Sequence, residues 1–169
     1  MTALGIDIGA TNIRYGILVG DKLEQTSSTK SHIESPAKLV KQIKDIVNEF
    51  REFDNLGVAM PGPIDKNGVV YASPNFPMGA WEEVHFKNVL SSTLARPFVL
   101  DRDSVAALVG EWKLGAAKGA KNAVLLTIGT GIGGAAVVNG KILRGHHGLA
   151  SEFGHALVVS RETHQEARL

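Results

Sequence analysis

The chain has 169 residues, of which 44% are hydrophobic, so it can build a folded core and is neither disordered nor fibrous. Its 18 basic and 17 acidic residues leave a net charge of +1, and no basic block is present to attract nucleic acid. The absence of cysteine excludes disulfides, iron–sulfur clusters and thiolate zinc sites. No apolar run is long enough for a membrane helix, and residues 1–7 lack the basic start of a signal peptide. We therefore expect a cytoplasmic protein with no membrane and no nucleic-acid partner.

Hydrophobic periodicity and turn residues predict a mixture of strands and helices along the chain. Apolar runs broken by glycine predict strands at 4–8 and 13–19, and the turn at Gly20-Asp21 predicts a third strand at 22–26. Ser35 as N-cap and Pro36 at the first helical position predict a helix whose apolar stripe continues to Phe50. Further on, we predict strands at 56–60 and 98–100, a loop at 65–79, and helices at 84–94 and 103–112, the last capped by Asp103.

The segment 114–122 is small and polar, which is typical of a linker. Beyond it the pattern of the N-terminus returns at a constant spacing of 120 residues, so that Ile8-Gly9 corresponds to Ile128-Gly129 and Gly20 to Gly140. Each segment has an apolar strand, a glycine turn with threonine, a second apolar strand and a hairpin. Such a repeat indicates two related lobes, although any two glycine hairpins share part of this pattern.

Two glycine loops carry the groups that a phosphate site needs. Glycine lets backbone N–H groups converge on an oxyanion, and threonine hydroxyls add donors. The second loop also matches the dinucleotide-binding pattern, but a strand follows it where that pattern needs a helix, and neither loop continues as a Walker A motif. The first loop contributes Asp7, Gly9, Thr11, Asn12 and Arg14, and the second contributes Gly129, Thr130, Gly131 and Gly133.

An acidic residue in the first of two such loops is what an actin-like phosphotransferase requires. Asp7 would order Mg²⁺ or its water ligands, while Thr11, Asn12 and Arg14 would approach the phosphates of a nucleotide. The alternative for Asp7 is a structural carboxylate at the end of a strand.

In this order and spacing, several further motifs resemble those of the ROK sugar kinases, a family that includes bacterial glucokinases and N-acetylhexosamine kinases. The resemblance extends to about His155. The motifs are Leu4 to Asn12, Gly57 to Asp65 with Ser73-Pro74-Asn75 and Trp81, Asp101-Arg102-Asp103 with Gly110-Glu111, the second glycine loop, and Arg144-Gly145 with Gly148 to His155.

The resemblance implies an α/β fold of two actin-like (ribonuclease H-like) lobes with the active site in the cleft. It assigns residues 1–113 to a complete N-terminal lobe, 114–122 to a linker, and 123–169 to the beginning of a second lobe that carries the second phosphate loop. The implied reaction is transfer of the γ-phosphoryl group of ATP, with Mg²⁺, to a hydroxyl group of a hexose or N-acetylhexosamine.

The resemblance also assigns roles to the sugar-site residues. Asp103 matches the carboxylate that takes the proton from the attacking hydroxyl, a role that is compatible with capping a helix. Arg102 stands beside it where family members usually have asparagine. Glu152 and His155 match residues that hydrogen-bond sugar hydroxyls, and Gly62 and Asn75 match loops that close over the sugar. Without the resemblance, His155 would be read as a packed or surface histidine.

The sequence departs from the family pattern in two further ways. The motif that ends in His155 is normally followed by a cysteine-rich zinc site, and because no cysteine follows here, no zinc site is predicted. Ala10 replaces a usual glycine and therefore needs a negative φ angle. The strands expected at 123–138 would expose an apolar face, so we expect self-association, most simply a homo-oligomer, or a flexible second lobe.

Two alternatives to a kinase follow from the same residues. A sugar-sensing ROK regulator carries a DNA-binding helix-turn-helix ahead of the first loop, and here that loop begins six residues after Met1. A non-catalytic sugar-binding remnant is the second alternative.

Overall fold

The computed structural model describes residues 1–50, 52–72, 76–129, 131–159 and 166–168. Contacts divide the chain into two compact units, Met1–Asp103 and Ser104–Leu169. Each unit has its own sheet and its own buried cluster of apolar side chains. Of the helices in the described ranges, none has the length and apolar character needed to span a bilayer.

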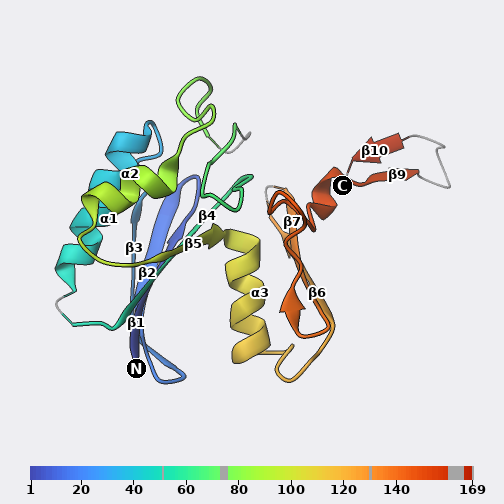
Figure 1. The fold of residues 1–169 in the computed structure, drawn as a ribbon, viewed down its shortest axis with the longest axis horizontal. Helices are drawn as coiled ribbons and strands as arrows, with labels where there is room; N and C mark the ends of the chain where they lie inside the picture. Colours follow the sequence, from blue (N-terminus) through green and yellow to red (C-terminus); the bar gives the residue numbers. More distant parts are fainter. Residues whose placement is uncertain (51, 73–75, 130, 160–165, 169) are drawn as a thin grey trace. The chain divides into compact units, whose positions relative to one another are not determined.

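The first unit is built on a five-stranded sheet in the order β3-β2-β1-β4-β5 (Figure 1). Strands β1, β2 and β3 form an antiparallel meander, whereas β1, β4 and β5 run parallel to one another. The strands are β1 (Thr2–Ile8), β2 (Asn12–Val19), β3 (Lys22–Lys30), β4 (Asn55–Met60) and β5 (Val99–Arg102).

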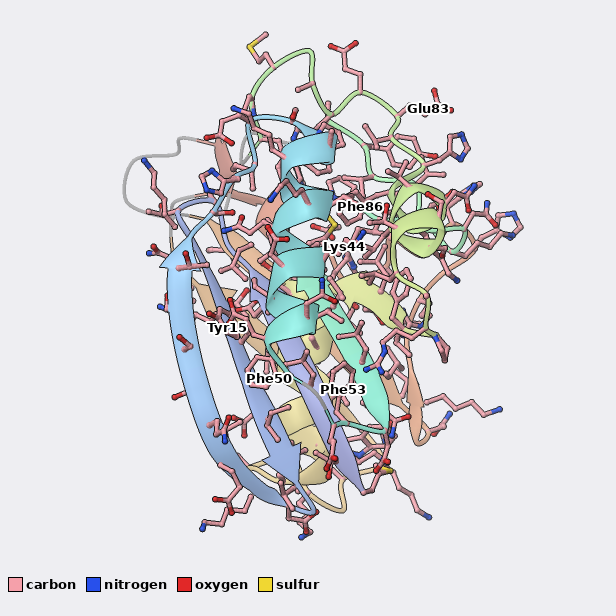
Figure 2. All side chains as sticks on the ribbon, turned by 90° about the vertical axis from the view of Figure 1, so that its left-hand side faces the viewer. Tyr15, Lys44, Phe50, Phe53, Glu83 and Phe86 are labelled. Carbon is pink, nitrogen blue, oxygen red and sulfur yellow. The ribbon has the colours of Figure 1, made fainter. Side chains whose placement is uncertain are left out.

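Helices α1 (Pro36–Glu49) and α2 (Phe86–Thr93) contribute their apolar faces to the core of this unit (Figure 2). The start of α1 is confirmed, because the Ser35 hydroxyl accepts a hydrogen bond from the Lys38 backbone N–H and Pro36 takes the first helical position. Near its end, Tyr15 meets Phe50 edge to face at 6.0 Å between ring centroids. The buried residues of α1 are Leu39, Val40, Ile43, Ile46 and Val47, which join Leu4, Ile6 and Ile8 of β1 in one core.

The long connection between β4 and α2 is mostly irregular, as predicted, but it supplies part of the core. Val70 forms isolated bridges with Ile64 and with Val84, and its side chain is fully buried. Trp81 is also buried, stacks on Phe76 at 4.5 Å between centroids, and donates its indole N–H to the Ile33 carbonyl at 2.8 Å. This connection is therefore anchored to the unit by an aromatic residue and one buried hydrogen bond.

The second unit contains helix α3 (Asp103–Lys113), which begins at the division between the units, and two small sheets. Val105 and Leu108 of α3 pack on Ala135 and Val137 of the larger sheet. That sheet has the order β6-β7-β8 and is an antiparallel meander like β1-β2-β3, so the predicted repeat is present. The elements are β6 (Ala123–Ile128), β7 (Ile132–Val138), β8 (Lys141–Ile142), the 3₁₀ turn η1 (Phe153–His155), and the pair β9 (Leu157–Val159) and β10 (Glu166–Arg168).

Several element boundaries differ from the sequence prediction. The helix predicted from Val84 begins at Phe86, because Val84 pairs with Val70 in a bridge. Strand β5 continues through Arg102 instead of ending at Leu100, and β3 continues through Lys30 instead of ending at Thr26.

The segment 114–122, predicted as a linker, lies within the second unit. The Trp112 indole N–H donates to the Ala120 carbonyl at 2.8 Å, and the Lys121 carbonyl accepts from the Gly140 N–H at 2.8 Å. The Asn122 side chain accepts from the Asn139 N–H at 2.9 Å. These bonds tie the segment to α3 and to the turn between β7 and β8.

Candidate active site

Three segments that carry predicted site residues begin at one edge of the first unit's sheet. Strands β1, β4 and β5 are parallel, so their last residues, Ile8, Met60 and Arg102, lie at the same edge. The first glycine loop, the Pro61-Gly62-Pro63 segment and Asp103 follow these strand ends directly. The carboxyl edge of parallel strands is the usual position of a ligand site in α/β sheets.

The first glycine loop is a tight turn fixed by backbone hydrogen bonds. The Gly9 N–H donates to the Asn12 carbonyl at 2.9 Å, and a Cβ atom at Gly9 would lie 2.8 Å from that same oxygen, so only glycine fits. The Thr11 carbonyl accepts from the Ser31 N–H at 2.9 Å, which ties the loop to the end of β3. Thr11 and Asn12 are exposed, and Ala10 has the negative φ angle that the sequence demands.

Asp7 and Arg14 are paired residues of the β1–β2 hairpin that leads into this loop. Both residues are exposed as a whole, but surrounding protein desolvates the Asp7 carboxyl group and raises its pKa above the usual range, while the Arg14 guanidinium acts to lower it. A carboxylate held in this way is stabilised by a bound cation. A single exposed carboxylate is also compatible with Mg²⁺, which usually binds proteins through one or two carboxylates and completes its coordination with water or substrate phosphates.

The register of the parallel strands places Asp101 on the same face of the sheet as Asp7. Asp7 pairs with Ala59, and Ala59 pairs with Asp101, and parallel partners share a face. The Asp101 carboxylate accepts a hydrogen bond from the Arg102 N–H at 2.9 Å. No role for Asp101 follows from the sequence alone. The available signal was its position in the last residues of a strand, two residues before Asp103.

Arg102 lies on the face of the sheet opposite to Asp7 and Asp101, together with Met60, its neighbour in the pairing of β4 with β5. Only 2% of Arg102 is exposed, so its side chain does not extend into solvent. Asp103, by contrast, is exposed and is the first residue of α3, where the positive end of the helix dipole favours an ionised carboxylate. The two neighbouring charged residues therefore differ sharply in exposure.

The loop after β4 contains Gly62 and the turn at Asp65. Gly62 has a φ angle of 91°, which glycine adopts readily. Burial acts to raise the pKa of Asp65. The backbone N–H groups of Val69 and Asn67 donate hydrogen bonds to its carboxylate at 2.9 and 2.8 Å, and these bonds act to lower the pKa. The net effect holds the pKa of Asp65 below its usual range. Asn75, the other loop residue predicted to meet the sugar, lies outside the described residues.

In the second unit, β6 and β7 hold the second glycine loop. The Gly129 N–H donates to the Gly131 carbonyl at 2.9 Å, and Gly133 continues into β7 opposite Thr127. Thr130 lies outside the described residues. The turn pairs Ile128 with Ile132, so it is one residue shorter than the first glycine loop, where Ile8 pairs with Ile13.

Glu152 precedes the 3₁₀ turn η1 and His155 is its last residue, and the turn packs on the start of β7. Gly134 is covered by the Phe153 ring, and a Cβ atom at Gly134 would overlap that ring. A Cβ atom at Gly154 would likewise overlap the Ile132 carbonyl. Glu152 is half-buried and His155 is exposed. Two glycines thus fix the segment that carries both predicted sugar contacts against the strand that follows the second glycine loop.

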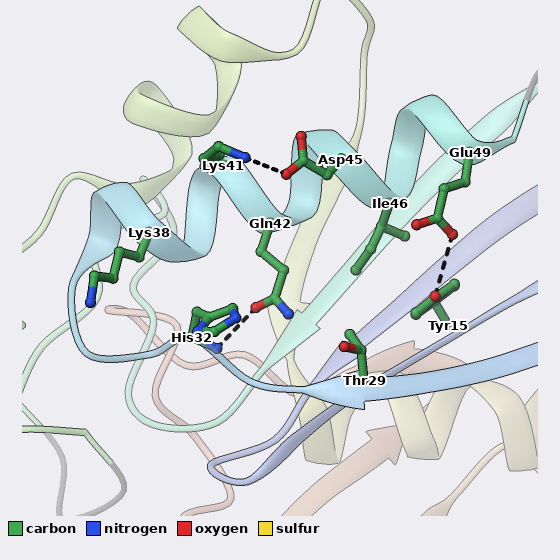
Figure 3. A pocket seen from close by; sticks show the side chains of 9 residues that line it. All are labelled: Tyr15, Thr29, His32, Lys38, Lys41, Gln42, Asp45, Ile46 and Glu49. Carbon is green, nitrogen blue, oxygen red and sulfur yellow. Dashed lines mark hydrogen bonds and ion pairs between the residues drawn. The ribbon is translucent and has the colours of Figure 1, made fainter.

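A groove of about 450 Å³ in the first unit lies between α1 and strands β2 and β3 (Figure 3). Its polar groups bind one another: Lys41 pairs with Asp45 at 2.7 Å, and the Tyr15 hydroxyl donates to Glu49 at 3.3 Å. None of its nine lining residues is a predicted site residue: Tyr15, Thr29, His32, Lys38, Lys41, Gln42, Asp45, Ile46 and Glu49. Within the described ranges, no group of three His, Asp or Glu side chains is placed to hold a metal ion.

The fold is that of the actin-like ATPases, as found in ROK sugar kinases of known structure. A glucokinase from Streptomyces griseus, solved in complex with glucose and AMPPNP, is 29% identical and superposes with a TM-score of 0.83 over 94% of this chain and 51% of that one. The ROK family model matches residues 3–166, and the chain belongs to the ROK family.

Curated relatives include both kinases and a regulator. The glucokinase of Streptomyces coelicolor is 31% identical over 160 residues, which cover 92% of this chain and 50% of the relative. The xylose repressor of Bacillus spizizenii is 28% identical over 166 residues, which cover 92% of this chain and 42% of the repressor. The chain therefore spans about half the length of the curated glucokinase that it matches.

Proposed function

We propose that this chain acts in an ATP-dependent sugar kinase that transfers the γ-phosphoryl group of ATP to a hydroxyl group of a hexose or N-acetylhexosamine. The observation that carries the proposal is that Asp103 and the first glycine loop both follow strand ends at one edge of the same sheet. Membership in the ROK family and the similarity to glucokinases support it.

In this proposal the first glycine loop holds the phosphates. The hydroxyl of Thr11 and the amide of Asn12 donate to phosphate oxygens, and Arg14 supplies a positive charge next to Asp7. The second loop, with Gly129, Thr130, Gly131 and Gly133, offers backbone donors to the same nucleotide. Asp7 holds Mg²⁺ directly or through water, and bound Mg²⁺ neutralises charge on the phosphates.

Asp103 is the general base of the proposed reaction. The sugar hydroxyl oxygen forms a bond to the γ-phosphorus, the bond from that phosphorus to the leaving ADP oxygen breaks, and the hydroxyl proton passes to the Asp103 carboxylate. An ionised carboxylate at a helix N-terminus is a weak base, which suits a loose transition state in which the proton leaves late. Gly62, Asn75, Glu152 and His155 position the sugar, and Arg102 borders it.

The substitution Asp103→Asn tests this assignment, because asparagine keeps the size of the side chain and cannot accept the proton. Turnover should fall by about 10²–10⁴-fold, while the sugar dissociation constant from calorimetry changes far less. Asp45→Asn, an exposed carboxylate on α1, is the matched control and should leave both quantities unchanged. Equal losses of turnover and affinity in Asp103→Asn would make Asp103 a binding residue.

The similarity to a xylose repressor supports sugar sensing as a second candidate function. Both functions require the sugar site, and only the kinase requires phosphoryl transfer. A chain that binds a hexose tightly and releases no ADP with any hexose would favour the sensor.

A further inference from the structure

Within the second unit, β7 presents small residues to helix α3 where the strand begins. Gly133, Ala135 and Val137 lie on one face of β7, because alternate residues of a strand point the same way. Ala135 and Val137 are buried together with Val105 and Leu108 of α3, so this face is the one on which the helix packs. Residue size on this face therefore increases with distance from the second glycine loop.

Ser104 is the residue of α3 that meets Gly133. Only 4% of Ser104 is exposed. A Cβ atom at Gly133 would lie 3.6 Å from the Ser104 Cβ atom, and 2.5 Å from the hydroxyl oxygen of Thr127, its partner on β6. The overlap with Thr127 makes glycine necessary at position 133, and the methylene group of Ser104 closes the other side. The start of α3 therefore rests on bare backbone of β7.

This contact is one residue away from the proposed general base. Asp103 is the first residue of α3 and Ser104 is the second, and the helix from Ser104 onward belongs to the second unit. Gly133 is the last of the predicted phosphate-binding residues of the second glycine loop and the second residue of β7. Because a helix is stiff, the depth at which Ser104 sits on Gly133 sets where the start of α3 lies relative to that loop.

We propose that Ser104 is a positioning residue for Asp103. Its small side chain lets the start of α3 rest on Gly133, and this contact fixes the spacing between the Asp103 carboxylate and the backbone donors of the second glycine loop. The inference rests on the proposed function, in which Asp103 accepts the hydroxyl proton while this loop helps to hold the nucleotide. The proton acceptor and the γ-phosphorus must both be aligned with the sugar hydroxyl, so a displacement of about 1 Å is enough to slow the reaction.

The substitution Ser104→Val tests the proposal, since valine adds a second γ branch to a side chain that is almost fully buried. Turnover in a coupled ADP-release assay should fall about 10–10²-fold, while KM for the hexose changes by less than about threefold. Ser104→Ala keeps the side chain small and should retain turnover, which separates the effect of size from loss of the hydroxyl group. In NMR spectra, the amide resonances of Gly129 and Gly131 should move in Ser104→Val and not in Ser104→Ala.

Ala107→Val is the matched control, because it places the same side chain at an exposed position of the same helix. It should leave both turnover and the resonances of the second glycine loop unchanged. Thermal melts check that each variant folds. If Ser104→Val does not fold, Ser104→Thr takes its place, since threonine adds one methyl group and keeps the hydroxyl, and it should also lower turnover without a matching change in KM.

The proposal is overturned if the larger residue at position 104 leaves turnover intact, if Ala107→Val loses as much, or if Ser104→Ala loses as much. It is also overturned if the resonances of the second glycine loop do not move. An unmodified chain that releases no ADP with any hexose contradicts the proposed function instead, and the loop resonances then decide alone whether the Ser104 contact sets the position of α3.

Discussion

Asp7 and Arg14 face each other across the β1–β2 hairpin, and the Arg14 charge opposes the effect of burial on the Asp7 carboxyl group. Desolvation raises the pKa of Asp7, and the Arg14 guanidinium lowers it, with desolvation the larger effect. The folded chain therefore holds an ionised Asp7 at a cost. A carboxylate kept in this state is suited to bind a cation, because bound Mg²⁺ offsets the cost.

The first prediction is that Asp7→Asn stabilises the chain and weakens nucleotide binding. Because the pKa of Asp7 is raised on folding, stability is lost as pH rises through and above the usual pKa of an aspartate. Denaturant unfolding should show the variant more stable than the unmodified chain at about pH 7 and equally stable at about pH 2, where both states are protonated. Affinity for Mg²⁺-ATP should fall at least about tenfold, the effect of losing a charge-assisted contact.

The exposed turn residue Asp21 provides the control, since Asp21→Asn should change neither quantity. Unchanged Mg²⁺-dependent nucleotide affinity in Asp7→Asn would contradict the role given to the first glycine loop.

The second prediction concerns the glycine beneath Phe153. In Gly134→Ala the added methyl group meets the Phe153 ring, so the turn that carries Glu152 and His155 must shift. We expect a loss of about 1–3 kcal/mol in stability and weaker hexose binding, although Gly134 itself has no assigned sugar contact. Gly110→Ala, where a Cβ atom meets nothing within 4 Å, should leave hexose affinity unchanged. Equal hexose affinities in the two variants would show that η1 does not position the sugar contacts.

The third prediction concerns Trp81, which anchors the connection that carries Gly62. Trp81→Phe keeps the stacking on Phe76 but leaves the buried Ile33 carbonyl without its indole donor. Unfolding experiments should show a loss of about 1–3 kcal/mol, the usual cost of an unsatisfied buried acceptor. A change within about 0.3 kcal/mol would mean that water or a backbone shift replaces this bond.

The fourth prediction concerns Arg102, which is almost fully buried at the end of β5. An arginine beside Asp103 can place its guanidinium in solvent or at the site of the sugar hydroxyl, and its burial excludes the position in solvent. Arginine offers donors only, whereas asparagine offers both a donor and an acceptor to a neutral sugar. Arg102→Asn should tighten binding of glucose or N-acetylmannosamine by about 1 kcal/mol in calorimetric titration. Unchanged or weaker binding would show that Arg102 points away from the sugar.

Much of the secondary structure of the first unit can be predicted from the sequence, because helix caps, turn glycines and apolar periodicity depend on neighbouring residues. The Ser35-Pro36 start of α1 and the strands around Gly9 depend on neighbouring residues and were predicted within a residue or two. The predicted start of α2, at Val84, was wrong because Val84 forms a bridge with Val70, and this contact between distant residues leaves no local sequence pattern.

The candidate site likewise has features that the sequence indicates and features that depend on the folded structure. The residue types of Asp7 and Thr11 in a glycine loop indicate phosphate chemistry, whereas the role of general base for Asp103 comes from its match to the family motif. The shared face of Asp7 and Asp101 depends on the pairing of three strands, and the packing of Phe153 on Gly134 depends on a tertiary contact. Such relationships need the assembled fold.

The most direct test of sugar phosphorylation is a coupled ADP-release assay of this chain against a panel of hexoses, with and without Mg²⁺. The proposed function predicts ADP release that requires both Mg²⁺ and one hexose or N-acetylhexosamine, and that falls by about 10²–10⁴-fold in Asp103→Asn. ADP release that is absent with every sugar, or that is the same with and without sugar, would contradict it.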